Sequence, residues 1–155
     1  MRNLVLAICT FALISCAPNV QELDDVLIEK PSAFSVAQTT DRLVSEVQAK
    51  GAKVFARINH GAGARKMGAD IGDIELLIFG NPKMGTPLIS QQARIGLDLP
   101  LKILIWQEDG QTKMGFNDPA KLGEWYGLEP TDPTLTKMRG VLEHVTREAG
   151  RADKE

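Results

Sequence analysis

The residues best suited to binding chemistry gather at a glycine–proline corner. Gly80-Asn81-Pro82 follows a short apolar run, and Lys83 and Thr86 come soon after it. Glycine tolerates positive φ and proline fixes its own φ, so we expect the chain to turn sharply here. The side chains of Asn81, Lys83 and Thr86 would then lie at the tip of a buried strand, where sites often sit on a rigid frame.

Three interpretations of this corner compete. The spacing of Gly80 and Gly85 resembles a phosphate-binding loop, but that motif needs Lys and then Ser or Thr after its second glycine, whereas Thr86 follows Gly85 directly. A looser anion site could be formed by backbone N–H groups together with Lys83. The third interpretation is a purely structural turn.

His60 is the best titratable candidate. It closes an alternating stretch, residues 53–60, and a period of two places it on the same face as Val54, Ala56 and Ile58. At a strand end beside glycines, a histidine is either a hydrogen-bonded structural residue or a general acid or base.

A hairpin predicts the remaining candidates. Asp109-Gly110 is a strong signal for a two-residue turn, which would place Lys102 opposite Asn117 and Trp106 beside Lys113 as a cation–π pair. Asp118 follows one residue beyond Asn117. The candidate ligand-binding set is therefore His60, Asn81, Lys83, Thr86, Asp98, Lys102, Asn117 and Asp118.

The sequence supplies no complete catalytic set and predicts no cofactor. Both cysteines, Cys9 and Cys16, lie near the amino terminus, so the folded domain has no thiol. Its two histidines, His60 and His144, lack a carboxylate at ligand spacing, which argues against a metal site. No serine stands in a nucleophile elbow. The formal net charge is −2 and the Lys and Arg residues are interspersed with acidic ones, so the sequence does not indicate a basic surface for binding nucleic acid.

The amino terminus predicts export. A short basic start, residues 1–3, precedes an apolar run, residues 4–14, that is too short to span a membrane, so we interpret residues 1–15 as a signal peptide. Leu13-Ile14-Ser15-Cys16 resembles the lipobox of bacterial lipoproteins, which implies a lipid on Cys16. The alternative is ordinary cleavage after Ala17.

These features predict a protein of the cell envelope that is held on the membrane by the lipid on Cys16. Residues 16–25, polar and interrupted by Pro18, are expected to act as a tether. Because Ala rather than Asp stands at position 17, the pattern resembles lipoproteins of the outer membrane facing the periplasm, if the source is Gram-negative.

The rest of the chain predicts one α+β domain, residues 26–149, followed by a charged tail, residues 150–155. Strands are expected at residues 26–30, 53–60, 75–79 and 101–106 and after the hairpin turn, with helices at 36–50, 82–92, 118–126 and 133–149. Residues 61–64 are expected to form a turn. The predicted architecture has two layers, a mainly antiparallel sheet of about five strands packed against helices, in the order β-α-β-β-α-β-β-α-α.

Three blocks of sequence, residues 79–88, 96–106 and 116–119, together resemble the domain of unknown function family 302. The resemblance covers residues 26–128 and implies a compact α+β fold able to dimerise, with no assigned reaction. The family usually has Asp where this chain has Asn59, Tyr in place of Phe116, and often His in place of Tyr126. An acid–base role that depends on those positions is therefore not supported in this chain.

Three functional hypotheses follow. The first is a binding module for a small anionic ligand, which would suit the lysines of the candidate set. The second is a structural or assembly module that acts as a homodimer. The third is a hydrolase-like or acid–base enzyme that uses His60, although a nucleophile or partner for it is not evident.

Overall fold

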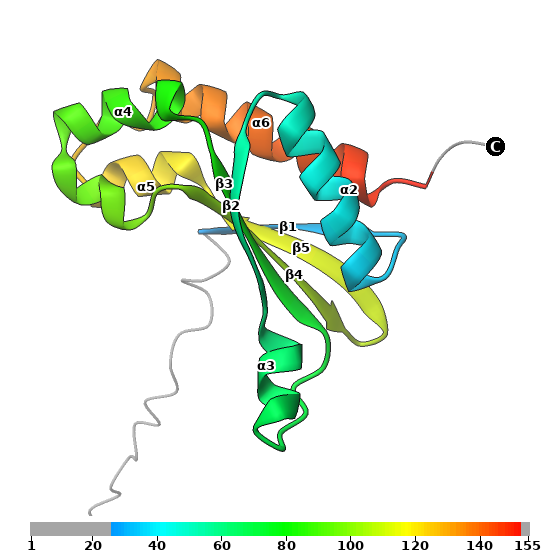
Figure 1. Ribbon diagram of the computed structural model, residues 1–155. Coiled ribbons are helices and arrows are strands. Elements are labelled where there is room, and N and C mark those ends of the chain that lie inside the picture. The colour runs from blue at the N-terminus through cyan, green and yellow to red at the C-terminus, as the bar shows by residue number, and fades with distance from the viewer. Residues whose placement is uncertain (1–25, 153–155) are drawn as a thin grey trace, which may run out of the picture.

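The structure of the chain is a computed structural model that describes residues 26–152 (Figure 1). The predicted signal peptide, Cys16 and the tether lie outside the described residues. A single antiparallel sheet has the strand order β1-β5-β4-β3-β2. Its strands are β1 (Leu27–Ser32), β2 (Lys53–Asn59), β3 (Ile74–Gly80), β4 (Leu101–Glu108) and β5 (Gln111–Asn117).

Helices α2 (Val36–Ala49) and α6 (Pro133–Gly150) lie on one side of this sheet (Figure 1). Three further helices lie beyond one end of the strands: α4 (Pro82–Gln91), the 3₁₀ helix η1 (Ala93–Leu97) and α5 (Pro119–Trp125). Helix α3 (His60–Lys66) lies beyond the other end. The predicted two-layer α+β fold is confirmed, with α3 and the 3₁₀ helix η1 as additions to the expected order. None of the helices in residues 26–152 has the length and apolar composition needed to cross a membrane.

Local sequence signals account for several of these elements. Ser35 accepts a hydrogen bond from the backbone N–H of Gln38 and completes the predicted capping box at the start of α2. Asp109 and Gly110 both have positive φ, 51° and 77°, as a two-residue hairpin turn requires. Pro31 lies in β1, an edge strand, where its missing N–H removes no bond from a central ladder.

The hairpin register is only partly as predicted. Trp106 pairs with Lys113, but the β4–β5 ladder ends at Leu104 and Gly115, so Lys102 and Asn117 do not form a pair within it. Asn117 is instead paired with Leu27 of β1. The ammonium of Lys113 is ion-paired with Glu29 and Glu108, and the predicted contact with the Trp106 ring is not found among the described residues.

The predicted faces of β2 are wrong because a bulge interrupts the alternation. Val54 pairs with Phe79, but the next pairs are Ala56 with Ile78 and Arg57 with Leu77, so one residue is inserted between them. Arg57 therefore shares the helix-covered face with Leu77, while Ala56 points to the open face.

The expected turn after β2 is a helix. Asn59 is the N-cap of α3, and its side-chain oxygen accepts a hydrogen bond from the backbone N–H of Ala62 at 2.6 Å. His60 is consequently the first residue of α3 and is exposed, not closing an apolar face.

Two hydrophobic clusters hold the layers together. The larger one lies between the sheet and helices α2 and α6, and includes Leu43, Leu77, Phe79, Ile103 and Leu142. The smaller one joins α4, η1, α5 and α6 through Leu88, Ile95, Leu122, Leu135 and Met138. Because α6 contributes to both clusters, it connects the sheet to the segment beyond its end.

A buried carboxylate sits at the other end of the sheet. Glu75 of β3 is 4 % exposed. Its oxygens accept hydrogen bonds from Nε of Arg57 at 2.6 Å and from Nδ2 of Asn59 at 2.8 Å, and Arg57 also pairs with Asp41 of α2. The hydrogen bond to Glu75 raises the pKa of Arg57. A charge removed from water in this way is tolerable only while its partners remain.

Replacing Arg57 with Met should therefore destabilise the fold. The change leaves the Glu75 carboxylate buried without its cation, and we expect a loss of about 2–4 kcal/mol in the free energy of unfolding, below the range for fully buried pairs because Arg57 is partly exposed. Urea unfolding measures this loss. The double variant Arg57→Met with Glu75→Leu should recover most of it, and an equally unstable double variant would contradict the explanation.

Candidate functional site

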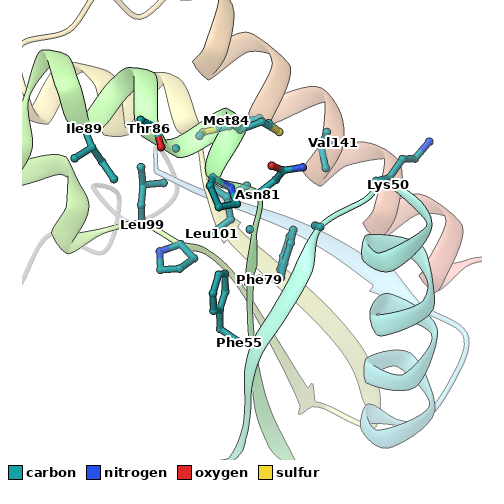
Figure 2. Close-up of a pocket in the computed structure, with 16 residues that line it drawn as sticks. Lys50, Phe55, Phe79, Asn81, Met84, Thr86, Ile89, Leu99, Leu101 and Val141 are labelled. Atoms are coloured by element: carbon teal, nitrogen blue, oxygen red, sulfur yellow. The ribbon is translucent and has the colours of Figure 1, made fainter.

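A cavity of about 270 Å³ opens where β3 turns into α4 (Figure 2). Its walls come from the corner itself, from α4, from the start of β4, from the beginning of β2 and from α6. Its lining residues include Phe55, Gly80, Gly85, Thr86, Leu99 and Val141. An apolar-walled cavity of about 150 Å³ is enough to hold benzene, so this one has room for a larger ring or a short chain.

The cavity lies at the seam between the two hydrophobic clusters. Among its lining residues, Phe79 belongs to the larger cluster and Leu101 packs against that cluster. Met138 belongs to the smaller cluster, and Met84 and Leu99 pack against it. Helix α4 makes most of its contacts with η1 and α6 rather than with the strands. The space between α4 and the sheet end therefore stays unfilled.

Two glycines influence the shape of this space. A Cβ at Gly80 would lie 3.2 Å from Cβ of Pro100 and 3.6 Å from the ring of Phe55, so its absence lets both side chains approach the strand. Gly85 lies in α4 without a positive φ, and a Cβ there would meet only Leu99, at 3.8 Å. A larger side chain at position 85 would therefore enter the cavity without backbone strain.

Asn81 fixes the corner that forms the rim. Its side-chain oxygen accepts from the backbone N–H of Lys83 at 3.0 Å, as the N-cap of α4, and its Nδ2 donates to the carbonyl of Gly51 at 3.0 Å. One side chain thus ties the start of α4 to the turn between α2 and β2.

The polar groups at the cavity are few. Thr86 presents a hydroxyl from α4, and the ammonium of Lys50 is directed away from Asn81 (Figure 2). The lining includes no histidine, aspartate or glutamate. Such a site can hold a molecule by burial of apolar surface and offers few groups for proton transfer.

The predicted site residues do not converge. Asn81 and Thr86 line the cavity, but Lys83 is exposed on α4 and outside the lining. His60 lies at the opposite end of β2 and β3, because Asn59 pairs with Glu75 whereas Lys53 pairs with Gly80. The seven residues of β3, at about 3.3 Å each, separate the two ends by on the order of 20 Å.

Asp98 and Lys102 do meet, although neither belongs to the cavity lining. The Lys102 ammonium donates to the backbone carbonyls of Asp98 and Pro100, at 2.6 and 3.2 Å. The Asp98 carboxylate accepts from the hydroxyl of Tyr126 at 2.6 Å. This hydrogen bond is the main reason why the pKa of Tyr126 is raised. Desolvation of the hydroxyl and the negative charge of the Asp98 carboxylate raise the pKa further.

Asn117 and Asp118 have structural positions. Asp118 is the N-cap of α5, where its carboxylate accepts from the backbone N–H of Ala120 and pairs with Arg139 of α6 at 3.1 Å. Asn117 ends β5 and is exposed. Of the eight predicted residues, two lie in the cavity wall and the others serve turns, caps or the surface.

Sequence reasoning missed most of the walls. Phe55 comes from a bulged edge strand, Leu99 and Pro100 from the start of β4, and Val141 from the last helix. These are ordinary apolar residues in segments far apart along the chain. No local pattern marks them, since only the packing of α4 brings them together.

Comparison with known proteins assigns the chain to a family. Residues 28–145 match the sequence pattern described as Domain of unknown function DUF302. The chain belongs to the DUF302 family. A crystal structure of an uncharacterised conserved DUF302 protein from Bacillus stearothermophilus superposes with a TM-score of 0.65 at 21 % identity, covering 80 % of this chain and 94 % of the other. At that identity the likeness concerns the fold.

Curated relatives of this DUF302 chain are named fluoride-specific ion channels. FluC 1 of Brucella suis and FluC 1 of Brucella abortus are each 39 % identical to it over 112 residues, which is 72 % of this chain. The match spans 44 % and 42 % of the two relatives, so the chain covers less than half of their length.

The contact between Asp98 and Tyr126 can be tested by titration, because Tyr126 is the sole tyrosine of the chain. Tyrosinate absorbance should titrate above the ordinary pKa of about 10. Because the pKa of Tyr126 is raised in the folded protein, the stabilisation that its protonated hydroxyl provides is complete at pH values below the pKa of tyrosine in the unfolded chain. This stabilisation is lost as the pH rises through the pKa of Tyr126 in the folded protein. Asp98→Asn should lower the observed pKa, and an unchanged titration in that variant would exclude the contact.

Proposed function

We propose that this DUF302 protein is a binding module for a small, largely apolar molecule, tethered in the cell envelope by a lipid on Cys16. The observation that carries the binding proposal is the cavity at the β3–α4 corner, whose walls are almost entirely hydrocarbon. Burial contributes about 25 cal/mol per Å² of apolar surface, so such walls favour rings and aliphatic chains.

The ligand chemistry differs from the anionic ligand expected from the sequence. Neither Lys83 nor Lys102 reaches the cavity, and Lys102 is already bound to two carbonyls. Thr86 can donate or accept one hydrogen bond at the edge. A neutral molecule with one polar group, or none, therefore suits the cavity better than an anion.

The binding proposal predicts a matched pair of variants. Gly85→Leu places a side chain in the cavity, whereas Gly140→Leu makes the same change in α6, where a Cβ has nothing within 4 Å. Both changes remove a helix glycine and should not weaken the fold. With the full chain and the neutral fluorescent probe N-phenyl-1-naphthylamine, Gly85→Leu should lower affinity by about tenfold or more. Gly140→Leu should bind as the wild type does.

Competition distinguishes the two ligand chemistries with the same probe. Octan-1-ol should displace it at least as well as octanoate, and Lys50→Ala, Lys83→Ala and Lys102→Ala should each leave the displacement curves unchanged, although Lys50 lies in the cavity lining. A clear preference for octanoate that any of these lysine variants abolishes would favour the anionic site. Equal binding by Gly85→Leu and the wild type would refute the cavity as the binding site.

The proposed location in the cell envelope is based on residues 1–17 and can be tested separately. Cells that express the chain should incorporate labelled palmitate into it, and the protein should fractionate with membranes, because two acyl chains hold a protein there while one binds reversibly. Cys16→Ser should lose both properties. If cleavage occurs after Ala17 instead, the protein will carry no label and Cys16→Ser will change nothing.

A further inference from the structure

We infer that the end of the domain formed by α4, η1 and α5 lies against a lipid bilayer and inserts exposed apolar side chains into it. The inference rests on the proposed lipid on Cys16, and it identifies the surface that this lipid brings to the membrane. The side chains are Ile89, Leu97 and Trp125, here called the helical-end patch, which keep 40 %, 85 % and 53 % of their surface exposed. Figure 1 shows their three helices together beyond one end of the strands.

Contacts between the helices bring the members of the patch together. A Cβ at Gly96, next to Leu97 in η1, would lie 4.0 Å from Cγ1 of Ile89, so η1 lies against the patch residue of α4. The hydroxyl of Tyr126, next to the patch residue of α5, donates to the carboxylate of Asp98, next to that of η1. Ile89 also lines the cavity, so the patch continues into the proposed binding site.

The chain enters the domain at this same end. The backbone N–H of Asp118, the N-cap of α5, donates to the carbonyl of Val26 at 2.8 Å, so the first described residue is held beside α5. Ten peptide units separate Val26 from Cys16, and they span at most about 35 Å. A lipid on Cys16 therefore keeps the helical end within reach of the bilayer surface.

The opposite end of the domain reaches the bilayer less readily. There Met67, the C-cap of α3, is also 85 % exposed. To place it on the membrane, the residues that link the domain to Cys16 would have to run back along strands that are on the order of 20 Å long, which uses more than half of their maximum length. Extending a chain in this way costs conformational entropy, so the helical end is favoured.

The composition of the patch suits lipid better than protein. Tryptophan and leucine are typical of helices that lie in the bilayer interface, where the indole ring can contact hydrocarbon while its N–H stays among the headgroups. Three side chains cover far less than the roughly 800 Å² per partner of a stable protein interface. They suffice at a bilayer, because a lipid anchor raises the effective concentration of the membrane and makes even a weak contact persist.

The charges around the patch are balanced. Residues 81–98 and 118–126, which contain α4, η1 and α5 with their caps, carry three cations and three carboxylates: Lys83, Arg94 and Lys121, and Asp98, Asp118 and Glu124. A surface without net charge is not drawn to anionic headgroups, so burial of apolar surface has to drive the contact. The contact should therefore not require anionic lipid.

The two tryptophans of the chain provide the test, because they lie at different ends of the sheet. Trp106 pairs with Ile74 at the start of β3, remote from α4, whereas Trp125 belongs to the patch. The chain, lipidated in cells, is incorporated into phosphatidylcholine vesicles whose acyl chains carry bromine, which quenches indoles that reach the hydrocarbon. In Trp106→Phe, emission from Trp125 should fall about twofold or more relative to vesicles without bromine. In Trp125→Phe, emission from Trp106 should be unchanged.

Two equally exposed residues give matched variants in the Trp106→Phe chain. Leu97→Glu should abolish the quenching, because a carboxylate is costly to place in hydrocarbon, whereas Met67→Glu at the opposite end should leave it unchanged. Circular dichroism checks that both variants remain folded. Vesicles that contain phosphatidylglycerol should give the same results as phosphatidylcholine alone.

Failure of this inference can be told apart from failure of the proposed anchor. A chain that floats with the vesicles while Trp125 stays unquenched overturns the inference alone. Equal quenching of Trp106 and Trp125, quenching that persists in folded Leu97→Glu or is lost in folded Met67→Glu, and quenching that requires phosphatidylglycerol also overturn it. A chain that carries no palmitate and does not float overturns both the inference and the proposed anchor.

Discussion

The arrangement of this domain depends on one side chain, the amide of Asn81. It caps α4 through the N–H of Lys83 and holds the carbonyl of Gly51, so two turns from different layers are joined at a single residue. The backbone carbonyl of Asn81 also accepts from Met84 and Gly85, which starts the helix at once. With its first turn fixed in this way, α4 leaves the sheet and packs on α6, and the cavity is the space that this direction creates.

Elements with strong local signals could be predicted from the sequence. The capping box at Ser35, the turn at Asp109-Gly110 and the Asp–Pro starts of α5 and α6 satisfy backbone groups within a few residues, so they form wherever the chain places them. The antiparallel two-layer fold follows from the order of such elements. In contrast, the bulge in β2 depends on the neighbouring strand, and it reversed the faces assigned to Ala56 and Arg57.

The site was harder to predict because it is defined by packing. Asn81 and Thr86 lie in the cavity wall, and the corner that carries them is marked in the sequence by glycine and proline. Lys102 seemed a ligand-binding residue from its predicted partner across the hairpin, yet the ladder stops before it and its ammonium caps carbonyls nearby. The buried Glu75 gave no signal at all, because its partners Arg57 and Asn59 become neighbours only when β2 and β3 pair.

Both margins of the sheet are unsuited to further strand pairing. Pro31 interrupts the outer hydrogen-bonding row of β1, and the bulge near Phe55 distorts that of β2. Fibril growth requires a flat, regular edge that can template the next chain, and this domain offers none on either side. High protein concentration should therefore not cause these molecules to form open-ended amyloid-like fibrils, even though much of the sheet surface is apolar.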